Sequence, residues 1–180
     1  ALRAERNAGL TIPGTSSPRA LRSAIVWPEI RVEGVNFLQA DGHRSLMFEE
    51  PVFSRLTELS DWGRTTLIDT ARELAPHLDR FRLTVEGHTD NIPLASTSAF
   101  ESNVHLGQRR AEVVVELLTG PGGLPAGSLR ADSREEQNPP YPNDTSANRR
   151  RNRTVVLHLE SDNDRDMDQD NEGNRQRSGR

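Results

Sequence analysis

The segment GHTDNIPLASTSAFESNVHLGQRRA, residues 87–111, carries an acid near one end and a base near the other. Asp90 comes a few residues after a predicted strand, where the chain leaves a sheet and where binding groups are common. Arg110 lies on the helix that the next residues predict, and Asn103 and Leu106 precede it on one stripe of that helix. A carboxylate and a guanidinium could therefore flank one small cleft.

The spacing of Asp90 and Arg110 leaves two interpretations open. The commoner arrangement is a plain salt bridge, which at a protein surface contributes about 0–1 kcal/mol. The other is a site for a zwitterion, in which the carboxylate accepts from an ammonium group and the planar guanidinium binds a carboxylate. The second arrangement requires the end of the strand to face the start of the helix.

The two elements that must position this pair can be predicted from periodicity. Apolar and polar residues alternate over residues 81–85, which predicts a half-buried strand that ends at Gly87. Apolar residues then repeat along one side of a helix that begins near Ser102 or Asn103 and stops at the GPGG of residues 120–123. Between them lies a polar loop.

The remaining elements complete one α/β domain. Three segments precede the strand. They are an extended stretch at 24–37 that Pro28 interrupts or places at an edge, a short strand leading into a loop within 45–56, and a helix capped by Ser60 or Asp61 and ended or bent by Pro76. Two predicted strands, 127–133 and 153–160, flank a polar loop at 138–152. This order implies an α/β (α+β) two-layer sandwich of the type βαβαβ-β, a mixed sheet with helices packed on one face.

Composition sets the domain limits and excludes several classes of function. Only 33% of the residues are hydrophobic, so part of the chain is expected to be unpacked. We predict a linker or flexible arm at 1–22, one domain at 23–160 and a disordered acidic and polar tail at 161–180. The net charge of −4 gives no overall attraction to nucleic acid, the absence of Cys excludes disulfides, and no apolar run is long enough to span a bilayer.

Three blocks of residues occur in a fixed order along the chain. They are VEGHTD, then Asn103, Leu106, Arg110 and Ala111, and then Asn143, Thr145, Arg149, Asn152 and Arg153 before the last strand. In this combination they resemble the OmpA-like C-terminal domain over about residues 45–160. Members of that family bind peptidoglycan non-covalently in the bacterial envelope, without catalysis and without a cofactor.

The resemblance implies a role for individual residues. Asp90 is expected to bind the ammonium group of the diaminopimelate in the stem peptide, and Arg110, rather than its neighbour Arg109, the carboxylate. The ligand-binding set that the resemblance implies also contains Thr89, Asn103, Leu106, Asn152 and Arg153, the last two shaping the site or its rim. Two residues depart from the family pattern: Gly107 stands where Ser is usual, and Thr154 where a second Arg is usual.

The insert NIPLASTSAFESN resembles the branch of the flagellar-stator B subunit, which is MotB-like. That resemblance implies a periplasmic or envelope location, a membrane-anchored parent, a partner in a membrane motor and a possible homodimer. The alternative is a structural module of the same fold without peptidoglycan binding, such as an outer-membrane or secretion-system accessory domain.

Other kinds of site find less support in the sequence. The five His residues show no ligand spacing, so His88 is expected to hydrogen-bond the backbone of the loop and no metal is expected. The run RRRNR at 149–153 has no interleaved aromatic residues, so we expect no nucleic acid partner. Neither G-x-S-x-G nor H-E-x-x-H occurs, which leaves hydrolysis without a recognisable nucleophile or metal motif.

Overall fold

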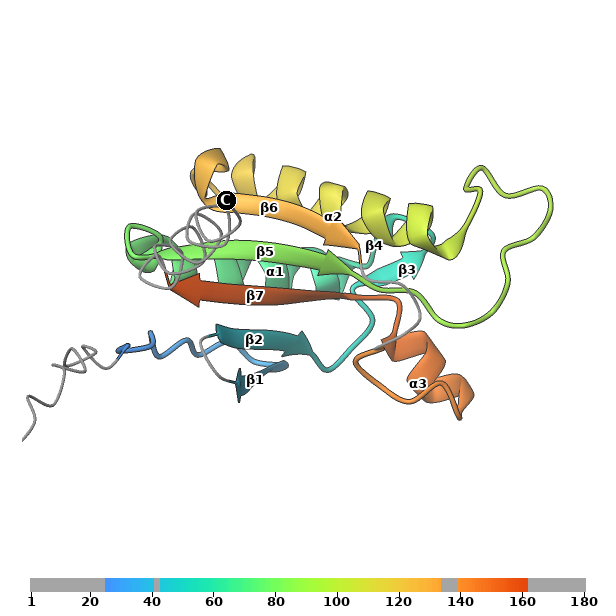
Figure 1. Cartoon of the computed structure of the whole chain (residues 1–180), viewed down its shortest axis with the longest axis horizontal. Coiled ribbons are helices and arrows are strands. Elements are labelled where there is room, and N and C mark those ends of the chain that lie inside the picture. The colour runs from blue at the N-terminus through green and yellow to red at the C-terminus, as the bar shows by residue number, and fades with distance from the viewer. Residues whose placement is uncertain (1–24, 41–42, 134–138, 162–180) are drawn as a thin grey trace, which may run out of the picture.

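A computed structural model describes residues 25–40, 43–133 and 139–161. In these ranges the main sheet has the strand order β1-β2-β7-β5-β6 (Figure 1). Its strands are β1 (Val35–Ala40), β2 (His43–Phe48), β5 (Phe81–Gly87), β6 (Leu129–Ser133) and β7 (Val155–Ser161). Because β5 and β6 are parallel while the other neighbours are antiparallel, the sheet is mixed.

Two long helices lie side by side on one face of this sheet (Figure 1). They are α1 (Asp61–Leu74) and α2 (Asn103–Thr119). The smaller elements are the hairpin of β3 (Phe53–Arg55) and β4 (Glu58–Leu59), the helix α3 (Ser146–Arg151) and short 3-10 turns at Ala75–His77 and Ala126–Ser128. The helix α2 connects the parallel strands β5 and β6, so the end of β5 lies close to the start of α2.

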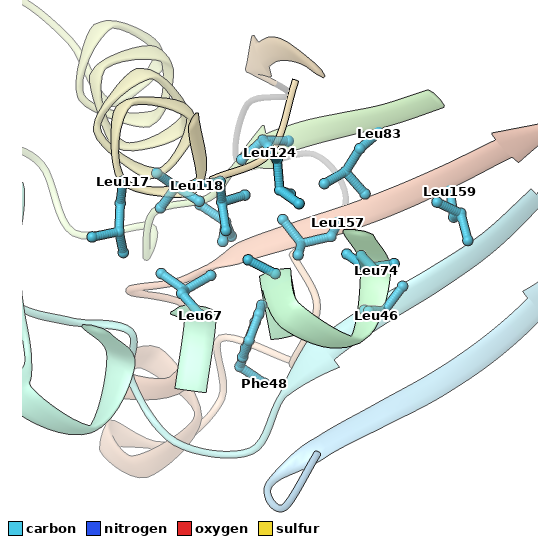
Figure 2. Packing of buried hydrophobic residues seen from close by; sticks show 14 of the residues in the cluster. Leu46, Phe48, Leu67, Leu74, Leu83, Leu117, Leu118, Leu124, Leu157 and Leu159 are labelled. Atoms are coloured by element: carbon cyan, nitrogen blue, oxygen red, sulfur yellow. The ribbon is translucent and has the colours of Figure 1, made fainter. Parts of the chain in front are cut away.

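The core lies between the sheet and the two helices. Alternate residues of the central strands, such as Leu83, Leu157 and Leu46, are buried on the helix-covered face and pack against Leu67 and Leu118 from the helices (Figure 2). Burial of one aliphatic side chain of this kind stabilises the fold by about 1.5–3 kcal/mol. This alternation is the physical reason why residues 81–85 form a strand with one face in the core.

Both long helices begin at serine caps. Ser60 Oγ accepts a hydrogen bond from the Gly63 N–H at 2.9 Å, and Ser102 Oγ accepts one from the His105 N–H at 3.1 Å. Such caps satisfy N–H groups that have no partner within the helix. The first helix ends before Pro76, which lies in the 3-10 turn, as the sequence predicts.

The two-layer fold and the mixed sheet confirm the sequence prediction, but several boundaries differ. The first strand begins only at Val35. Residues 25–32 lie outside any strand, although Ile30 is buried in the core. The predicted loop at 138–152 contains α3, which Thr145 caps through the Asn148 N–H at 3.1 Å. Ser161, predicted to start the tail, is the last residue of β7; the predicted arm at 1–22 and the rest of the tail lie outside the described residues.

None of the helices in the described part of the chain is long and apolar enough to cross a lipid bilayer.

Candidate functional site

The carboxyl end of β5 and the start of the neighbouring strand β7 lie at the same end of the sheet. Gly87 pairs with Val155 in the antiparallel register, and one step further the His88 N–H donates to the Thr154 carbonyl at 3.0 Å. This pairing carries β5 into Thr89 and Asp90 on one side and places Arg153 opposite them. Loops that leave the carboxyl ends of strands are common positions for binding groups.

The helix α2 comes close to the end of β5 because Gly107 of the helix faces Gly87 of the strand. A Cβ on Gly87 would overlap the carbonyl oxygen of Gly107 and lie 2.7 Å from its carbonyl carbon. A Cβ on Gly107 would lie 2.7 Å from Ser133 Oγ and 3.0 Å from the Gly87 carbonyl oxygen. The departure from the family pattern at position 107 therefore has a packing role, since a serine there would compete with Ser133 for the same space.

A cavity of about 590 Å³ opens between these elements. The predicted ligand-binding residues that line it are Thr89, Asp90, Asn103, Leu106, Arg110 and Arg153. The other lining residues come from the β3–β4 turn and from the loop after β5: Arg55, Leu56, Ile92, Pro93, Leu94, Ala95, Thr97, Ser98 and Ala99. The structure thus brings six of the seven predicted site residues to one cavity.

Arg110 is buried in the wall of this cavity. Only 3% of the residue is exposed, its Nε donates to the Leu56 carbonyl at 2.6 Å, and its Nη1 donates to the His88 carbonyl at 2.7 Å. The guanidinium carbon lies 5.1 Å from the centre of the Phe53 ring. These contacts fix the plane of the guanidinium and still use only part of its N–H groups, so the remaining donors can serve a ligand.

Burial lowers the pKa of Arg110 to about 10; the nearby carboxylate of Asp90 acts to raise it, and the charge of Arg153 acts to lower it. The guanidinium therefore stays protonated at neutral pH. A positive charge that is held in a buried position without a carboxylate partner interacts more strongly with an incoming anion than an exposed one would.

Asp90 also lines the cavity and is held in place by two contacts. Its Oδ1 accepts from the Ile92 N–H at 3.1 Å, and its Oδ2 lies 3.6 Å from Arg153 Nε. The side chain is 15% exposed. The carboxylate thus has a fixed orientation, but the distance to Arg153 is longer than a hydrogen bond, which leaves acceptor sites for a donor from a ligand.

No direct salt bridge joins the two residues that the sequence singled out. Among the described residues, Arg110 forms no ion pair with any carboxylate, and Asp90 pairs with Arg153 instead. The plain salt-bridge interpretation is therefore wrong. Arg109 points elsewhere, since its Nη1 pairs with Glu112 at 3.0 Å and Glu116 at 3.1 Å along the exposed side of α2.

Asn103 positions the loop that forms the outer wall of the cavity. Its Nδ2 donates to the Asp90 carbonyl at 3.3 Å and to the Ile92 carbonyl at 3.2 Å. The first residue of α2 is thereby tied to the first residues of the loop. This loop extends away from the domain beyond the start of α2 (Figure 1), and its inner residues line the cavity.

Asn152 is the predicted site residue that the structure leaves outside the cavity. It is fully buried, and its side chain bonds the Tyr141 N–H at 3.0 Å, the Tyr141 carbonyl at 2.8 Å and Asn143 Oδ1 at 2.8 Å. Asn152 therefore holds the segment before α3 and sets the backbone position of the neighbouring Arg153. Thr154 is also buried and does not line the cavity.

Sequence reasoning missed the contribution of the β3–β4 turn. Leu56 has a φ of 41°, a left-handed conformation that is strained for leucine, and in this conformation its carbonyl accepts from Arg110 Nε. Arg55 adds a further positive charge to the cavity lining. A backbone carbonyl leaves no mark in a sequence, whereas Arg55 and Phe53 could have been noticed only once the turn was known to lie beside Arg110.

The prediction for His88 is wrong, because its imidazole lies beside a carboxylate. His88 Nε2 lies 3.0 Å from Glu86 Oε1, and His158 Nε2 lies 3.1 Å from Glu86 Oε2. Ser45 Oγ in turn lies 2.9 Å from His158 Nδ1. Burial acts to raise the pKa of Glu86, but the hydrogen bonds and charges of the two histidines outweigh it and lower the pKa to about 2.

Metal binding finds no support in the described residues, where no group of three or more His, Asp or Glu side chains is arranged to hold an ion. The cavity instead offers one carboxylate and several guanidinium groups. Such a lining suits an organic ligand that carries both charges.

A family model described as the OmpA family matches residues 56–153 of the chain, from the β3–β4 turn to Arg153. No curated protein sequence matches the chain.

Solved structures are similar to the chain over most of its length. The periplasmic domain of Helicobacter pylori MotB is 26% identical with a TM-score of 0.65, and the match covers 73% of this chain and 82% of that one. The cell wall anchor of the T6SS from Pseudomonas aeruginosa is 27% identical with a TM-score of 0.60, covering 72% and 89%. A putative MotB-like protein from Desulfovibrio vulgaris, 23% identical with a TM-score of 0.62 and covering 71% and 81%, shows the fold alone.

Proposed function

The chain belongs to the OmpA family and has a MotB-like form of its fold, and from this premise we propose that it binds peptidoglycan non-covalently and without catalysis. The ligand is the diaminopimelate of the stem peptide, and it occupies the cavity between β5, α2 and the β3–β4 turn. The observation that carries the proposal is the separation of Asp90 from Arg110: both line one cavity, yet they form no ion pair with each other.

The charges of Asp90 and Arg110 each have a counterpart on the free end of diaminopimelate, which bears an ammonium and a carboxylate on one carbon. Asp90 accepts hydrogen bonds from the ammonium, and the remaining N–H groups of Arg110 bind the carboxylate. The carbonyls of Leu56 and His88 hold the guanidinium before the ligand arrives, so little side-chain entropy is lost on binding. A ligand that lacks either charge leaves a partly buried charge without its partner, which makes the site selective.

The surrounding charges favour the anionic character of a stem peptide. Arg55 and Arg153 line the cavity together with Arg110, against the single carboxylate of Asp90. Asn103 from the first turn of α2 also lines the cavity, so the positive end of the helix dipole lies at the site. Stem peptides carry additional carboxylates, and their binding should therefore weaken as the salt concentration rises.

The biological role that we propose is to anchor an envelope complex to the cell wall. One of the similar structures is itself a cell wall anchor, and others are periplasmic domains of MotB. We infer a periplasmic or envelope location from this similarity. A membrane motor as the partner and a homodimer as the working form remain parts of the proposal that rest on the MotB-like resemblance.

The test is sedimentation with purified diaminopimelate-containing sacculi. The wild-type chain should pellet with the sacculi, whereas Asp90→Asn and Arg110→Lys should stay in the supernatant. Arg109→Lys is the matched control, because this arginine lies on the same helix but pairs with Glu112 and Glu116 on its exposed side. A well-folded wild-type chain that stays in the supernatant would favour a structural module that keeps the fold without the ligand.

The same incubation tests the absence of catalysis. A binding domain should leave the sacculi intact, so the supernatant should contain no more soluble muropeptides than a control without protein. Release of fragments that increases with time and with protein concentration would contradict a purely binding role.

A further inference from the structure

A second cavity of about 430 Å³ adjoins the first on the other side of Arg153. Its lining residues are Glu50, Pro51, Phe53, Ser54, Ser60, Trp62, Arg150 and Arg153. Arg153 lines both cavities, and Phe53 lines the second while its ring faces the guanidinium of Arg110 in the first. The two cavities are therefore neighbours separated by one arginine and one aromatic ring.

The second cavity has a rigid aromatic wall. Trp62 lies edge-to-face against Phe48, with ring centres 6.4 Å apart and planes at 88°. The chain approaches the indole so closely at Gly34 that an added Cβ would lie 2.7 Å from Trp62 Cζ2. The indole is thus fixed before any ligand binds, and its half-buried position leaves part of it facing the cavity.

The rim of this cavity offers both a hydrogen-bond acceptor and hydrogen-bond donors. Glu50 and Arg150 are exposed, and within the described ranges neither side chain forms a hydrogen bond or an ion pair. Ser54 adds a hydroxyl group. An apolar wall with acceptors and donors around it suits a neutral ring that has one apolar face and several polar substituents.

Resting on the proposed function, we propose that this second cavity binds an N-acetylated hexosamine of the glycan strand while the first holds the diaminopimelate. A pyranose ring places its C–H face on the indole of Trp62, and its hydroxyl and acetamido groups bond Glu50 and Arg150. In an extended stem, the two residues between the diaminopimelate and the sugar-linked end span about 7 Å. Because Arg153 lines both cavities, one muropeptide that passes over this side chain can reach both.

The experiment compares two ligands on the full chain. One is the free stem tripeptide that ends in diaminopimelate, and the other is the same tripeptide attached to its disaccharide. The wild-type chain should bind the disaccharide-bearing ligand about tenfold more tightly, as expected for one aromatic contact with its hydrogen bonds. Trp62→Leu and Arg150→Ala should remove most of this difference and leave the affinity for the free tripeptide within about twofold.

Arg64→Ala is the control, because Arg64 lies on α1 near Trp62, is exposed and lines neither cavity. Arg150→Ala tests the sugar site independently of Trp62→Leu. Because Arg150 is an exposed residue of α3, its replacement should leave the fold intact even if Trp62→Leu folds poorly. Trp27→Phe leaves Trp62 as the single tryptophan of the chain. The fluorescence of that variant should change on addition of the disaccharide-bearing ligand and not on addition of the free tripeptide.

The outcomes separate the two proposals. If the wild type binds both ligands equally, or if Trp62→Leu and Arg150→Ala weaken both ligands to the same extent, the sugar site is overturned and the diaminopimelate site stands. If the wild type binds neither ligand, the proposed function is overturned and the sugar site with it. Selective loss of the disaccharide-bearing ligand in both variants supports the sugar site.

Discussion

The carboxylate of Asp90 pairs with Arg153, at 3.6 Å between Oδ2 and Nε, and not with Arg110 on the facing helix. Arg110 is instead held by two backbone carbonyls, which are neutral and cannot cancel its charge. This arrangement keeps an acid and a base apart in one cavity. It is the physical basis for the selectivity that we propose, because a direct Asp90–Arg110 pair would satisfy both groups without a ligand.

Replacing Asp90 with Asn should abolish most of the binding and leave the fold unchanged. The Asn side chain can still accept from the Ile92 N–H, so the loop keeps its turn, but the negative charge that binds the ammonium is lost. A charge-assisted hydrogen bond contributes about 1.5–3 kcal/mol, which corresponds to a loss of affinity of about 10- to 100-fold. Isothermal titration with a diaminopimelate muropeptide measures this loss, and a thermal melt checks the fold. An unchanged affinity would contradict the role of Asp90.

Alanine should affect stability differently at the two facing glycines, Gly87 and Gly107. Gly87→Ala should destabilise the domain by about 3 kcal/mol or more, because the new methyl group meets the backbone of Gly107, which cannot move without shifting α2. Gly107→Ala meets the hydroxyl of Ser133, which can rotate away from the Val104 carbonyl, and the Gly87 carbonyl oxygen at 3.0 Å. These costs are offset because Ala favours the helix by about 1 kcal/mol over Gly. Urea unfolding of both variants should therefore give a large loss for the first and a change near zero for the second. A change near zero for Gly87→Ala would contradict the close contact between the two glycines.

Asn152→Ala should reduce stability rather than contact with the ligand. Its buried side chain makes three hydrogen bonds to Tyr141 and Asn143, and truncation leaves buried backbone groups without partners. The expected loss is about 2–4 kcal/mol, whereas Asn143→Ala removes a single one of these bonds and should cost about 1 kcal/mol. Unfolding curves measure both values. A loss of muropeptide affinity in Asn152→Ala without any loss of stability would indicate direct contact with the ligand.

The stability of the domain should depend on Glu86 in acid. Because the pKa of this carboxyl is lowered to about 2 in the folded state, its ionised form is favoured by folding over an unfolded chain in which it titrates near 4.5. This contribution is fully present above about pH 4.5 and is lost as the pH falls from there towards 2. In urea unfolding, the wild type should exceed Glu86→Gln in stability at pH 7, and the difference should shrink between about pH 4.5 and 2. A difference that stays constant over this range would contradict the histidine–carboxylate interaction.

Much of the fold follows from local patterns in the sequence. The alternation at 81–85 and the serine caps at Ser60 and Ser102 act within a few residues of chain, so they predict β5 and both long helices correctly. The choice of Arg110 over Arg109 came from the family resemblance. In the structure Arg110 is buried at the cavity, whereas Arg109 pairs with Glu112, so the prediction rests on a physical difference that the sequence alone does not carry.

Other parts of the site depend on contacts that no local pattern carries. The carbonyl of Leu56 reaches Arg110 only because the β3–β4 turn folds against α2, and Asn152 turns inward because the segment around Tyr141 lies across it. The role of Gly107 depends on Gly87 and Ser133, which come from two different strands. The helix α3 was missed because its cap lies in a stretch rich in Pro and Asn, which is typical of loops.

The most direct test is titration with two muropeptides that differ only in the third residue of the stem. One carries diaminopimelate, and the other carries lysine, which keeps the ammonium for Asp90 and lacks the carboxylate for Arg110. The wild type should bind the diaminopimelate form at least about tenfold more tightly, as expected for the loss of one charge-assisted contact. Arg110→Lys should lose this preference, and Arg109→Lys should keep it. Equal affinity of the wild type for both muropeptides, or a preference that survives in Arg110→Lys, would contradict the account.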